Sequence, residues 1–385
     1  MLYNYIKGDI MFGLYIHIPF CRHICHYCDF YKMVVSDKFK EKIIDSIIKE
    51  YNQRDFDKNK VETIYIGGGT PSSLPYYILE KLLSNLNMEI DLSSLKEFTV
   101  ELNPEDINEE LVSILSKYHV TRVSIGIQSF NKNIIDRLGR FQFVTEDEIK
   151  SKIQILNKYN ITNINLDLIY AVPGEIVEDV IKDLKIINRL NITHVSTYSL
   201  ILEEHTVFNY LYNKGQIELI NDELDYQMYN KVRIMLNEFG FKQYEISNFS
   251  KPGFESLHNT NYWLNGEYLG IGPAASSHIG NTRFTNIKNA NKYIDGVNQN
   301  NYLYEEYYEN ELVDIYEEEL MMGLRLIRGI NINNFKEKFN IDLFKVYPKI
   351  NDLLKDGLLE IENNNLRIPS IHTYITNFIL VKIFE

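Results

Sequence analysis

The chain has 385 residues, a net charge of −13, 45% hydrophobic residues and 24% charged residues. The length predicts two or three domains, and this composition is ordinary for a globular protein with a large core. The negative charge argues against broad binding to nucleic acid, and no run approaches the ~20 apolar residues that span a bilayer.

The start of the chain carries no recognisable targeting segment. Residues 1–21 contain no apolar stretch of signal-peptide length and no small-residue cleavage site. All three cysteines follow within eight residues, at Cys21, Cys25 and Cys28, which is too close together for a disulfide framework. We therefore expect a reducing cytoplasm, with attachment to a membrane surface left open.

Short β-type runs alternate with longer amphipathic runs over the first 200 residues. Strands are predicted at 14–18, 63–67, 97–102, 122–127, 163–170 and 194–200. Helices are predicted at 37–51, 73–87, 108–117, 144–158 and 175–190. This alternation predicts a parallel sheet with right-handed crossovers, either doubly wound or an incomplete (β/α) barrel.

Polar residues collect where the predicted strands end. The cysteines follow the first strand, the run GGGTP (67–71) follows the second, and Glu101 ends the third. Gln128 ends the fourth strand, and Asp167 lies within the fifth. Because the carboxyl ends of parallel strands share one edge, one site built from many loops is expected.

The pattern changes after about residue 210. A helix is predicted at 222–239 with Gly240 as its C-cap, followed by short strands and ordered loops over 244–278. From 311 onward the pattern predicts helix, turn, helix and a hairpin turning at 362–365, which resembles a winged-helix fold. The acidic charge makes DNA binding the less favoured use of such a fold.

Three readings compete for the cysteine loop. A structural zinc site would need a fourth ligand from His17, His23 or His26, and a redox pair of Cys25 and Cys28 would leave Cys21 without a role. An iron–sulfur cluster with three protein thiolates would keep one iron open for substrate. The C-x3-C-x2-C spacing favours this third reading, because one loop can wrap three corners of a cubane.

The cysteine spacing, followed by GGGTP after the next strand, resembles the radical S-adenosylmethionine (SAM) superfamily. The blocks YIHIPFCRHICHYCDF, IGGGTPS, ELNPE, RVSIGIQSF, LDLIYAVPG, YEISNFS and HNTNYW resemble the oxygen-independent coproporphyrinogen III oxidase-like family. Phe30 stands where the oxidase branch has a further cysteine, and about a dozen residues precede the first strand. These departures and the HNxxYW block at 258–263 favour the HemW-type haem chaperone branch.

The resemblance implies a partial (β/α)6 radical SAM barrel, an α/β fold, followed by a smaller α+β region with a winged-helix-like C-terminal part. The expected domains are the barrel at 1–215, an accessory α+β region with the HNxxYW motif at 216–305, and the winged-helix-like domain at 306–385. The implied cofactors are SAM and a [4Fe–4S] cluster held by Cys21, Cys25 and Cys28.

The resemblance also assigns residues to SAM. Those implied at the SAM site are Tyr15, Tyr27, Gly68, Gly69, Thr70 and Glu101, and those matching contacts to a second SAM in the oxidase are Gln128, Arg140 and Asp167. Glu101 would pair with the SAM amino group. His258 is a candidate haem ligand, because neutral imidazole is a common axial ligand, and a histidine bonded into an ordered loop is the alternative.

The leading functional hypothesis is a haem chaperone that binds SAM and haem and delivers haem to acceptor haemoproteins. Membrane association and dimerisation are reported within that family. The second hypothesis is an enzyme, either a coproporphyrinogen oxidative decarboxylase or another radical SAM enzyme. The third is a binding protein stabilised by zinc. The sequence leaves open whether SAM is cleaved during function.

Overall fold

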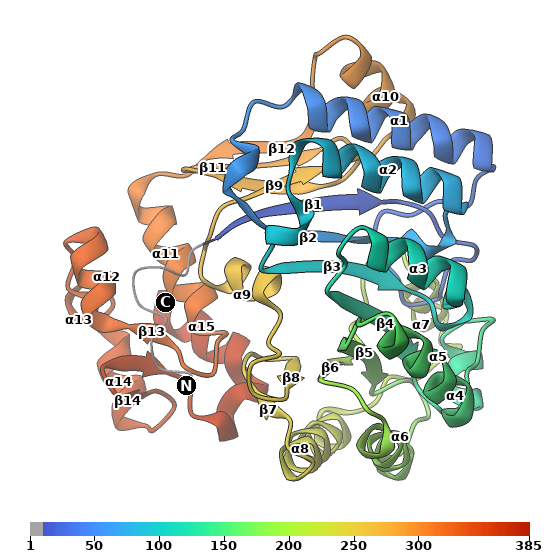
Figure 1. The fold of residues 1–385 in the computed structure, drawn as a ribbon. Helices are drawn as coiled ribbons and strands as arrows, with labels where there is room; N and C mark the ends of the chain where they lie inside the picture. Colours follow the sequence, from blue (N-terminus) through green and yellow to red (C-terminus); the bar gives the residue numbers. More distant parts are fainter. Residues whose placement is uncertain (1–10) are drawn as a thin grey trace.

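The computed structural model describes residues 11–385, and its largest element is a twelve-stranded sheet. Six of its strands are parallel and lie side by side in chain order (Figure 1). They are β1 (Phe12–Ile18), β2 (Val61–Gly68), β3 (Glu97–Leu102), β4 (Arg122–Gln128), β5 (Asn163–Tyr170) and β6 (His194–Ser199). Sequential order is the winding of a barrel, since a doubly wound sheet reverses its order.

One expected helix follows each of these strands in the chain. These helices are α1 (Asp37–Gln53), α2 (Tyr76–Glu89), α3 (Glu109–Lys117), α5 (Glu146–Lys158), α6 (Val177–Arg189) and α8 (Asp222–Glu238). Strand and helix positions agree with the sequence prediction to within a few residues, and Gly240 has the positive φ of +87° expected after α8. Two short helices between β4 and α8 were not predicted, α4 (Lys132–Arg137) and α7 (Val207–Asn213). The segment 244–278, predicted as short strands and ordered loops, also contains a helix at Leu257–Trp263.

The barrel stays open because other strands occupy both of its edges. β9 (Tyr268–Ile271) pairs in parallel with β1 and continues into the antiparallel strands β10 (Ser276–Ile279), β11 (Thr282–Asn286) and β12 (Tyr304–Glu309). On the other edge β8 (Asn248–Ser250) and β7 (Lys242–Gln243) extend the sheet antiparallel to β6. α9 (Leu257–Trp263) and α10 (Ala290–Asn298) complete this region.

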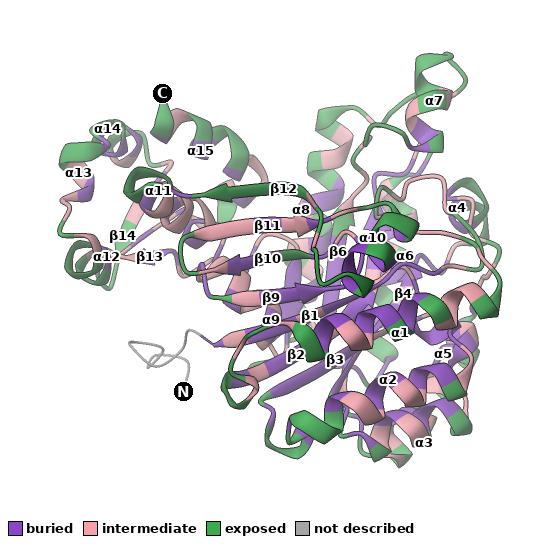
Figure 2. Cartoon of the chain, turned by 90° about the horizontal axis from the view of Figure 1, so that it is seen from above, coloured by how far each residue is buried: buried purple, intermediate pink, exposed green. Residues whose placement is uncertain are grey.

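The two faces of the barrel strands differ in chemistry. Along β4, Val123, Ile125 and Ile127 are buried in the main hydrophobic core, while Arg122 and Gln128 line a cavity inside the barrel. Because successive strand residues point to opposite faces, the apolar set packs outward against the helices. Figure 2 shows the buried faces of α1 and α2 turned toward the strands. The space that β1–β6 enclose is called the lumen below.

The C-terminal unit, residues 312–384, has a hydrophobic core of its own that runs from Tyr316 to Ile383. Its elements are α11 (Leu312–Gly323), β13 (Ile330–Asn331), α12 (Ile332–Phe339), α13 (Leu343–Val346), α14 (Lys349–Lys355), β14 (Glu360–Glu362), β15 (Asn365–Arg367) and α15 (Thr376–Phe384). The helices and the small antiparallel sheet β13-β15-β14 follow the winged-helix order. The predicted hairpin turns at Asn363 and Asn364, both with positive φ.

The C-terminal unit contacts the barrel at several points. The Ile327 amide donates to the Tyr244 carbonyl at 3.0 Å, and the Arg325 guanidinium lies 5.7 Å from the Trp263 ring centre. Tyr374, in the 3-10 helix Ser370–Ile375, donates to Asp225 on α8 at 3.3 Å. These contacts place the last segment of the chain against the barrel wall.

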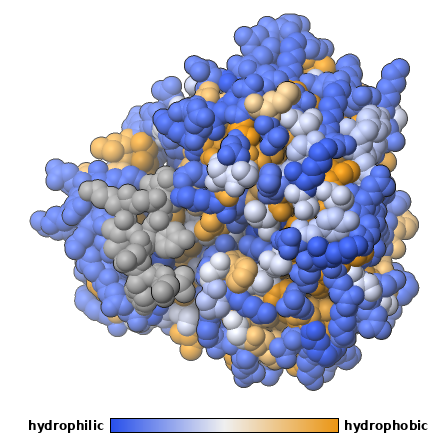
Figure 3. All heavy atoms as spheres, viewed as in Figure 1, coloured by the Kyte–Doolittle hydropathy of each residue, from blue (hydrophilic) through white to orange (hydrophobic). Residues whose placement is uncertain are grey.

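Hydrophilic residues dominate the face of the molecule seen in Figure 3, where hydrophobic residues show only in small separate groups. Within residues 11–385 no helix combines the length and apolar character needed to cross a membrane. The prediction about a targeting segment falls partly on residues 1–10, which lie outside the described residues.

Candidate functional site

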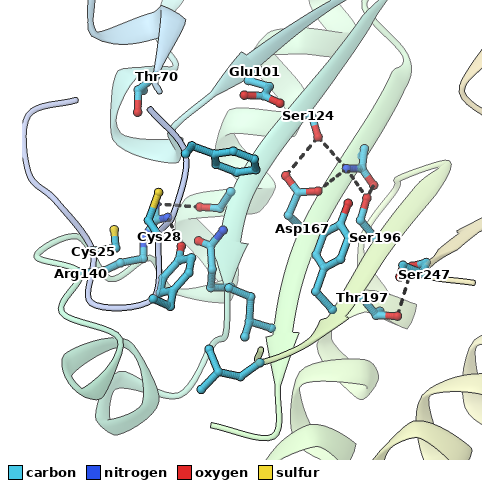
Figure 4. A pocket seen from close by; sticks show the side chains of 18 of the residues that line it. Cys25, Cys28, Thr70, Glu101, Ser124, Arg140, Asp167, Ser196, Thr197 and Ser247 are labelled. Atoms are coloured by element: carbon cyan, nitrogen blue, oxygen red, sulfur yellow. Dashed lines mark hydrogen bonds between the residues drawn. The ribbon is translucent and has the colours of Figure 1, made fainter. Parts of the chain in front are cut away.

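A cavity of about 680 Å³ opens at the carboxyl ends of the six parallel strands and reaches into the lumen (Figure 4). It brings together eleven of the residues predicted from the sequence. They are Cys21, Cys25, Tyr27, Cys28, Gly68, Gly69, Thr70, Glu101, Gln128, Arg140 and Asp167. The expectation of one site built from many strand ends is therefore matched by where these side chains lie.

The cysteine loop is fixed by backbone hydrogen bonds at both sides. The Cys21 amide donates to the Met33 carbonyl at 3.1 Å, and the His26 amide donates to the Leu138 carbonyl at 2.9 Å. All three thiols are free, and the Thr70 hydroxyl donates to Cys21 Sγ at 3.7 Å. The loop thus presents three unpaired thiols to one wall of the cavity.

These thiols are partly buried, and burial raises the pKa of Cys21 to about 11 and also raises that of Cys28. Metal binding at this loop must therefore displace protons. No three His, Cys, Asp or Glu side chains within residues 11–385 converge closely enough to hold a single metal ion.

The glycines after β2 allow close approach of neighbouring groups. A Cβ on Gly67 would lie 2.7 Å from Glu101 Cδ. Gly68 has φ of +107°, and a Cβ there would lie 2.5 Å from the His17 ring. Only glycine satisfies both the backbone conformation and the spacing, so the loop passes tightly between the first and third strands.

Glu101 is held from two sides at the end of β3. Tyr65 donates to its Oε1 at 2.7 Å, and the Gly68 amide donates to its Oε2 at 3.0 Å. Burial raises the pKa of Glu101 to about 7, and the nearby Asp167 carboxylate adds to the rise. The carboxyl group therefore changes charge near neutral pH, in a position that faces the cavity.

Asp167 belongs to a polar network inside the lumen. Its carboxylate accepts from Ser124 Oγ at 3.1 Å and from Asn165 Nδ2 at 2.8 Å (Figure 4). Asn165 Nδ2 also donates to Ser196 Oγ at 2.9 Å, which joins β4, β5 and β6. Burial raises the pKa of Asp167, and its hydrogen bonds oppose that rise.

Gln128 and Arg140 form the opposite wall. Gln128 has a positive φ of 63° at a register shift between β4 and β5, which aims its side chain into the cavity. Its Oε1 has no hydrogen-bond partner within residues 11–385. Arg140 donates to the Gly126 carbonyl at 3.0 Å and to the Tyr27 hydroxyl at 3.5 Å. Arg140 thereby ties the cysteine loop to β4.

A buried carboxylate joins the first three loops of the site. Asp106, whose side chain is 4% exposed, accepts from Arg22 in the cysteine loop and pairs with it. It also accepts from Ser72 Oγ at 2.6 Å, and Ser72 Oγ accepts from the Asn103 amide at 3.0 Å. The cysteine loop, the glycine loop and the loop after β3 therefore share one anchor.

Two predicted residues do not line the cavity. Tyr15 lies behind Tyr65, whose ring centre is 6.1 Å away, and its hydroxyl is 2.9 Å from His17 Nδ1. His258 is 1% exposed, and its Nδ1 and Nε2 lie 2.9 Å from Thr63 Oγ1 and 2.7 Å from the Tyr262 hydroxyl.

This arrangement bears on the haem role predicted for His258. Its ring would have to leave at least one hydrogen-bond partner before a nitrogen could coordinate iron. Burial, together with the charge of Arg122, lowers the pKa of His258 to about 3, so the ring stays neutral. The arrangement fits the alternative of a histidine bonded into an ordered loop, and its neighbour Asn259 lines the cavity instead.

Several cavity residues were not singled out from the sequence. Tyr65 and Arg122 line the lumen, and Thr373 and Tyr374 close one side of the cavity from the C-terminal unit. The signal for Arg122 lies in the alternation of RVSIGIQ, where every second residue is polar or glycine although the strand is central. No sequence signal marked Thr373 or Tyr374, because their place depends on a contact between distant parts of the chain.

Comparison with known proteins agrees with this geometry. Residues 15–187 match the model of the radical SAM superfamily, and residues 311–370 match that of the HemN C-terminal domain. A protein of Lactococcus lactis named heme chaperone HemW is 39% identical over 346 residues, covering 90% of each chain. The chain belongs to the HemW heme chaperone family. The HemW of Bacillus subtilis is 36% identical over 353 residues, covering 91% of this chain and 93% of that protein.

A solved structure extends the likeness of this HemW-family chain to its fold. Coproporphyrinogen III oxidase (HemN) from Escherichia coli superposes with a TM-score of 0.83 over 97% of this chain and 90% of its own, at 20% identity. At this identity the likeness concerns the fold alone. It covers both the open barrel and the C-terminal unit, so the HemW-family chain keeps the architecture of a radical SAM protein throughout.

Proposed function

We propose that this protein is a haem chaperone that carries a [4Fe–4S] cluster, binds SAM and delivers haem to acceptor haemoproteins. The observation that carries the proposal is the 39% identity, over 90% of both chains, to a protein named heme chaperone HemW. Membership of the radical SAM superfamily implies the cluster and SAM. The cavity supports this, because three free thiols and the Glu101 carboxyl group face the same space.

In this proposal Cys21, Cys25 and Cys28 hold the cluster, and Glu101 receives the SAM amino group by a charge-assisted hydrogen bond. When bound, the cluster would supply electron transfer and a binding point for SAM. The chain's own residues hold the cysteine loop in place. The Thr70 hydroxyl donates a hydrogen bond to Cys21 Sγ, and Asp106 fixes the loop by accepting from Arg22.

The decisive experiment is anaerobic reconstitution with iron and sulfide, followed by titration with iron protoporphyrin IX and incubation with an apo-haemoprotein. We expect about four irons per chain, stoichiometric haem binding, and transfer of haem to the acceptor. Cys25→Ser should lose the cluster, whereas Ser93→Ala, an exposed site remote from the cysteine loop, should retain it. Failure of the reconstituted protein to bind haem would refute the proposal.

The same preparation tests the enzymatic alternative. Coproporphyrinogen III is supplied with SAM and a reductant, and the tetrapyrroles are separated by chromatography. We expect no protoporphyrinogen, in keeping with Phe30 at the position where the oxidase branch has a cysteine. Clear decarboxylation would replace the chaperone proposal by an oxidase.

A further inference from the structure

The guanidinium of Arg122 lies at the inner end of the cavity, and two of its nitrogens have no hydrogen-bond acceptor among residues 11–385. Arg122 is the first residue of β4, is 1% exposed, and is the largest of the fully buried side chains. Within residues 11–385, neither its Nε nor its Nη1 has an acceptor. A buried charged donor without a partner is costly, so a fold that retains one is suited to an acceptor that the chain itself does not supply.

The nearby carboxylates do not fill this role. Glu101 and Asp167 both feel the charge of Arg122, which opposes the rise of their pKa values caused by burial. Their oxygens, however, accept from other groups, Glu101 from Tyr65 and Gly68, and Asp167 from polar side chains on β4 and β5. The two carboxylates thus balance the charge of the guanidinium without accepting from its Nε or Nη1, and the N–H groups on these two nitrogens stay available.

The histidines near Arg122 offer no spare acceptor either. His194 Nδ1 lies 2.6 Å from Asn165 Oδ1, which accepts its proton, so Nε2 accepts from the Tyr244 hydroxyl at 2.8 Å. Both nitrogens of His258 are likewise engaged. Burial and the charge of Arg122 lower the pKa values of both rings, which keeps them neutral. No second cation therefore competes with Arg122 from these two rings.

The other end of the cavity has a different character. Phe30, Phe141 and Ile201 line it and are 63%, 74% and 68% exposed, and these three residues are called the rim. Between the rim and Arg122, Gln128 offers an unpartnered Oε1. The cavity therefore changes from an apolar rim to a positively charged inner end. A ligand that fits it has an apolar body at the mouth and an anionic arm in the lumen.

We propose that Arg122 binds the carboxylate of a ligand that enters the barrel. A planar guanidinium suits a carboxylate because it can donate two parallel hydrogen bonds. Two ligands in the proposed function carry this group: the propionate arms of haem, and the amino acid end of SAM. The apolar rim favours haem as the source, and this assignment rests on the proposed function.

The test compares iron protoporphyrin IX with its dimethyl ester, which lacks both carboxylates, on the reconstituted protein. We expect the wild type to bind the acid at least about tenfold more tightly than the ester, the effect of one charged hydrogen bond. Arg122→Gln should remove most of this preference and Arg122→Lys should retain part of it. Arg189→Gln, an exposed site on the outer helix α6, should keep the full preference.

A parallel arm measures SAM and decarboxylated SAM with the same variants. A loss of affinity in Arg122→Gln for SAM but not for its decarboxylated analogue would keep the carboxylate site but overturn haem as its source. Unchanged preference in both arms, with a folded variant, would overturn the inference.

The ester comparison also guards against a variant that fails to fold. If Arg122→Gln is insoluble, equal binding of haem and its ester by the wild type overturns the haem assignment without any substitution at Arg122. A wild type that binds neither refutes the proposed function itself, so the two failures are distinguishable.

Discussion

The residues enclosed by strands β1–β6 are mostly polar, whereas those enclosed by the helices of the C-terminal unit are mostly apolar. In the lumen, Arg122, Asn165 and His194 are each no more than 1% exposed. In the C-terminal unit, Leu320, Phe335 and many other apolar side chains form one continuous cluster. The side chains named in the two interiors are equally buried, but they are stabilised by different interactions.

The difference shows how the barrel accommodates a binding site. Its strands place apolar residues outward, against α1–α6 and α8, and this outer layer provides the hydrophobic stabilisation. The inner face is thereby free to hold groups whose hydrogen bonds depend on one another. The C-terminal unit has no second interior face that could hold polar groups, because its small sheet and helices must share a single hydrophobic core.

The largest effect is expected in the C-terminal unit. Leu320→Ala removes a fully buried side chain from its core and should lower the free energy of unfolding by about 2–5 kcal/mol. Denaturant unfolding monitored by tyrosine fluorescence measures this, and iron content after reconstitution should stay at the wild-type level. A loss below about 1 kcal/mol would mean that apolar packing is not the main interaction that stabilises the interior of the C-terminal unit.

A smaller effect is expected from the lumen network. Asn165→Ala leaves Ser124, Ser196 and Asp167 without one of their partners and should cost about 1–3 kcal/mol. The matched variant Asn213→Ala, at an exposed position on α7, should change stability by less than about 0.5 kcal/mol. Equal values for the two variants would show that the lumen hydrogen bonds contribute nothing to folding.

The pH dependence of SAM binding tests one lumen carboxyl group. Because the pKa of Glu101 is raised to about 7, its charged form predominates only above that pH. The affinity for the cationic amino group should therefore fall about tenfold from pH 8 to pH 6, and Glu101→Gln should abolish the dependence. Isothermal titration at several pH values measures it, and an identical slope in the variant would contradict the assignment.

The raised pKa of Glu101 also makes the free energy of unfolding depend on pH. The folded state holds the Glu101 proton up to about pH 7, whereas the unfolded chain releases it near its ordinary value of 4.5. Glu101 therefore makes the ligand-free protein less stable as pH rises through this window. Glu101→Gln should remove that loss, which thermal melts at pH 5 and pH 8 can detect.

The smallest effect is expected on the outer surface of the barrel. Met88 lies near the end of α2 and is 71% exposed, so Met88→Gln should change stability by less than about 0.5 kcal/mol. Thermal melts alongside Leu320→Ala measure the contrast. A large loss would indicate that this side chain is covered in solution.

Much of the fold could be predicted because the barrel repeats one local pattern. Each apolar strand is followed by an amphipathic helix, and both periodicities are visible in the sequence. The short helices α4 and α7 escaped prediction because six or seven residues hold too little periodicity. The order of the strands in the sheet could not be predicted in this way, because a doubly wound sheet and an incomplete barrel produce the same alternation of strands and helices.

The site was predictable where its residues follow strands or match family motifs. The cysteine loop, Glu101 and Asp167 were found in this way. Arg122 was missed because the rule for parallel sheets points to the carboxyl ends of strands, whereas Arg122 begins its strand and lines the inner end of the cavity. Tyr374 was missed because its contact with Asp225 joins residues 149 positions apart, which no local pattern encodes.

The position of Thr373 and Tyr374 has a consequence for how the cavity is completed. These residues form one wall of the cavity, and Tyr374 is held there by its hydrogen bond to Asp225, 149 positions away. Closing a loop of that length costs conformational entropy, so this wall forms only when the C-terminal unit docks on α8. Because no strand of the barrel takes part in that contact, undocking of the segment would widen the entrance and leave the six parallel strands paired.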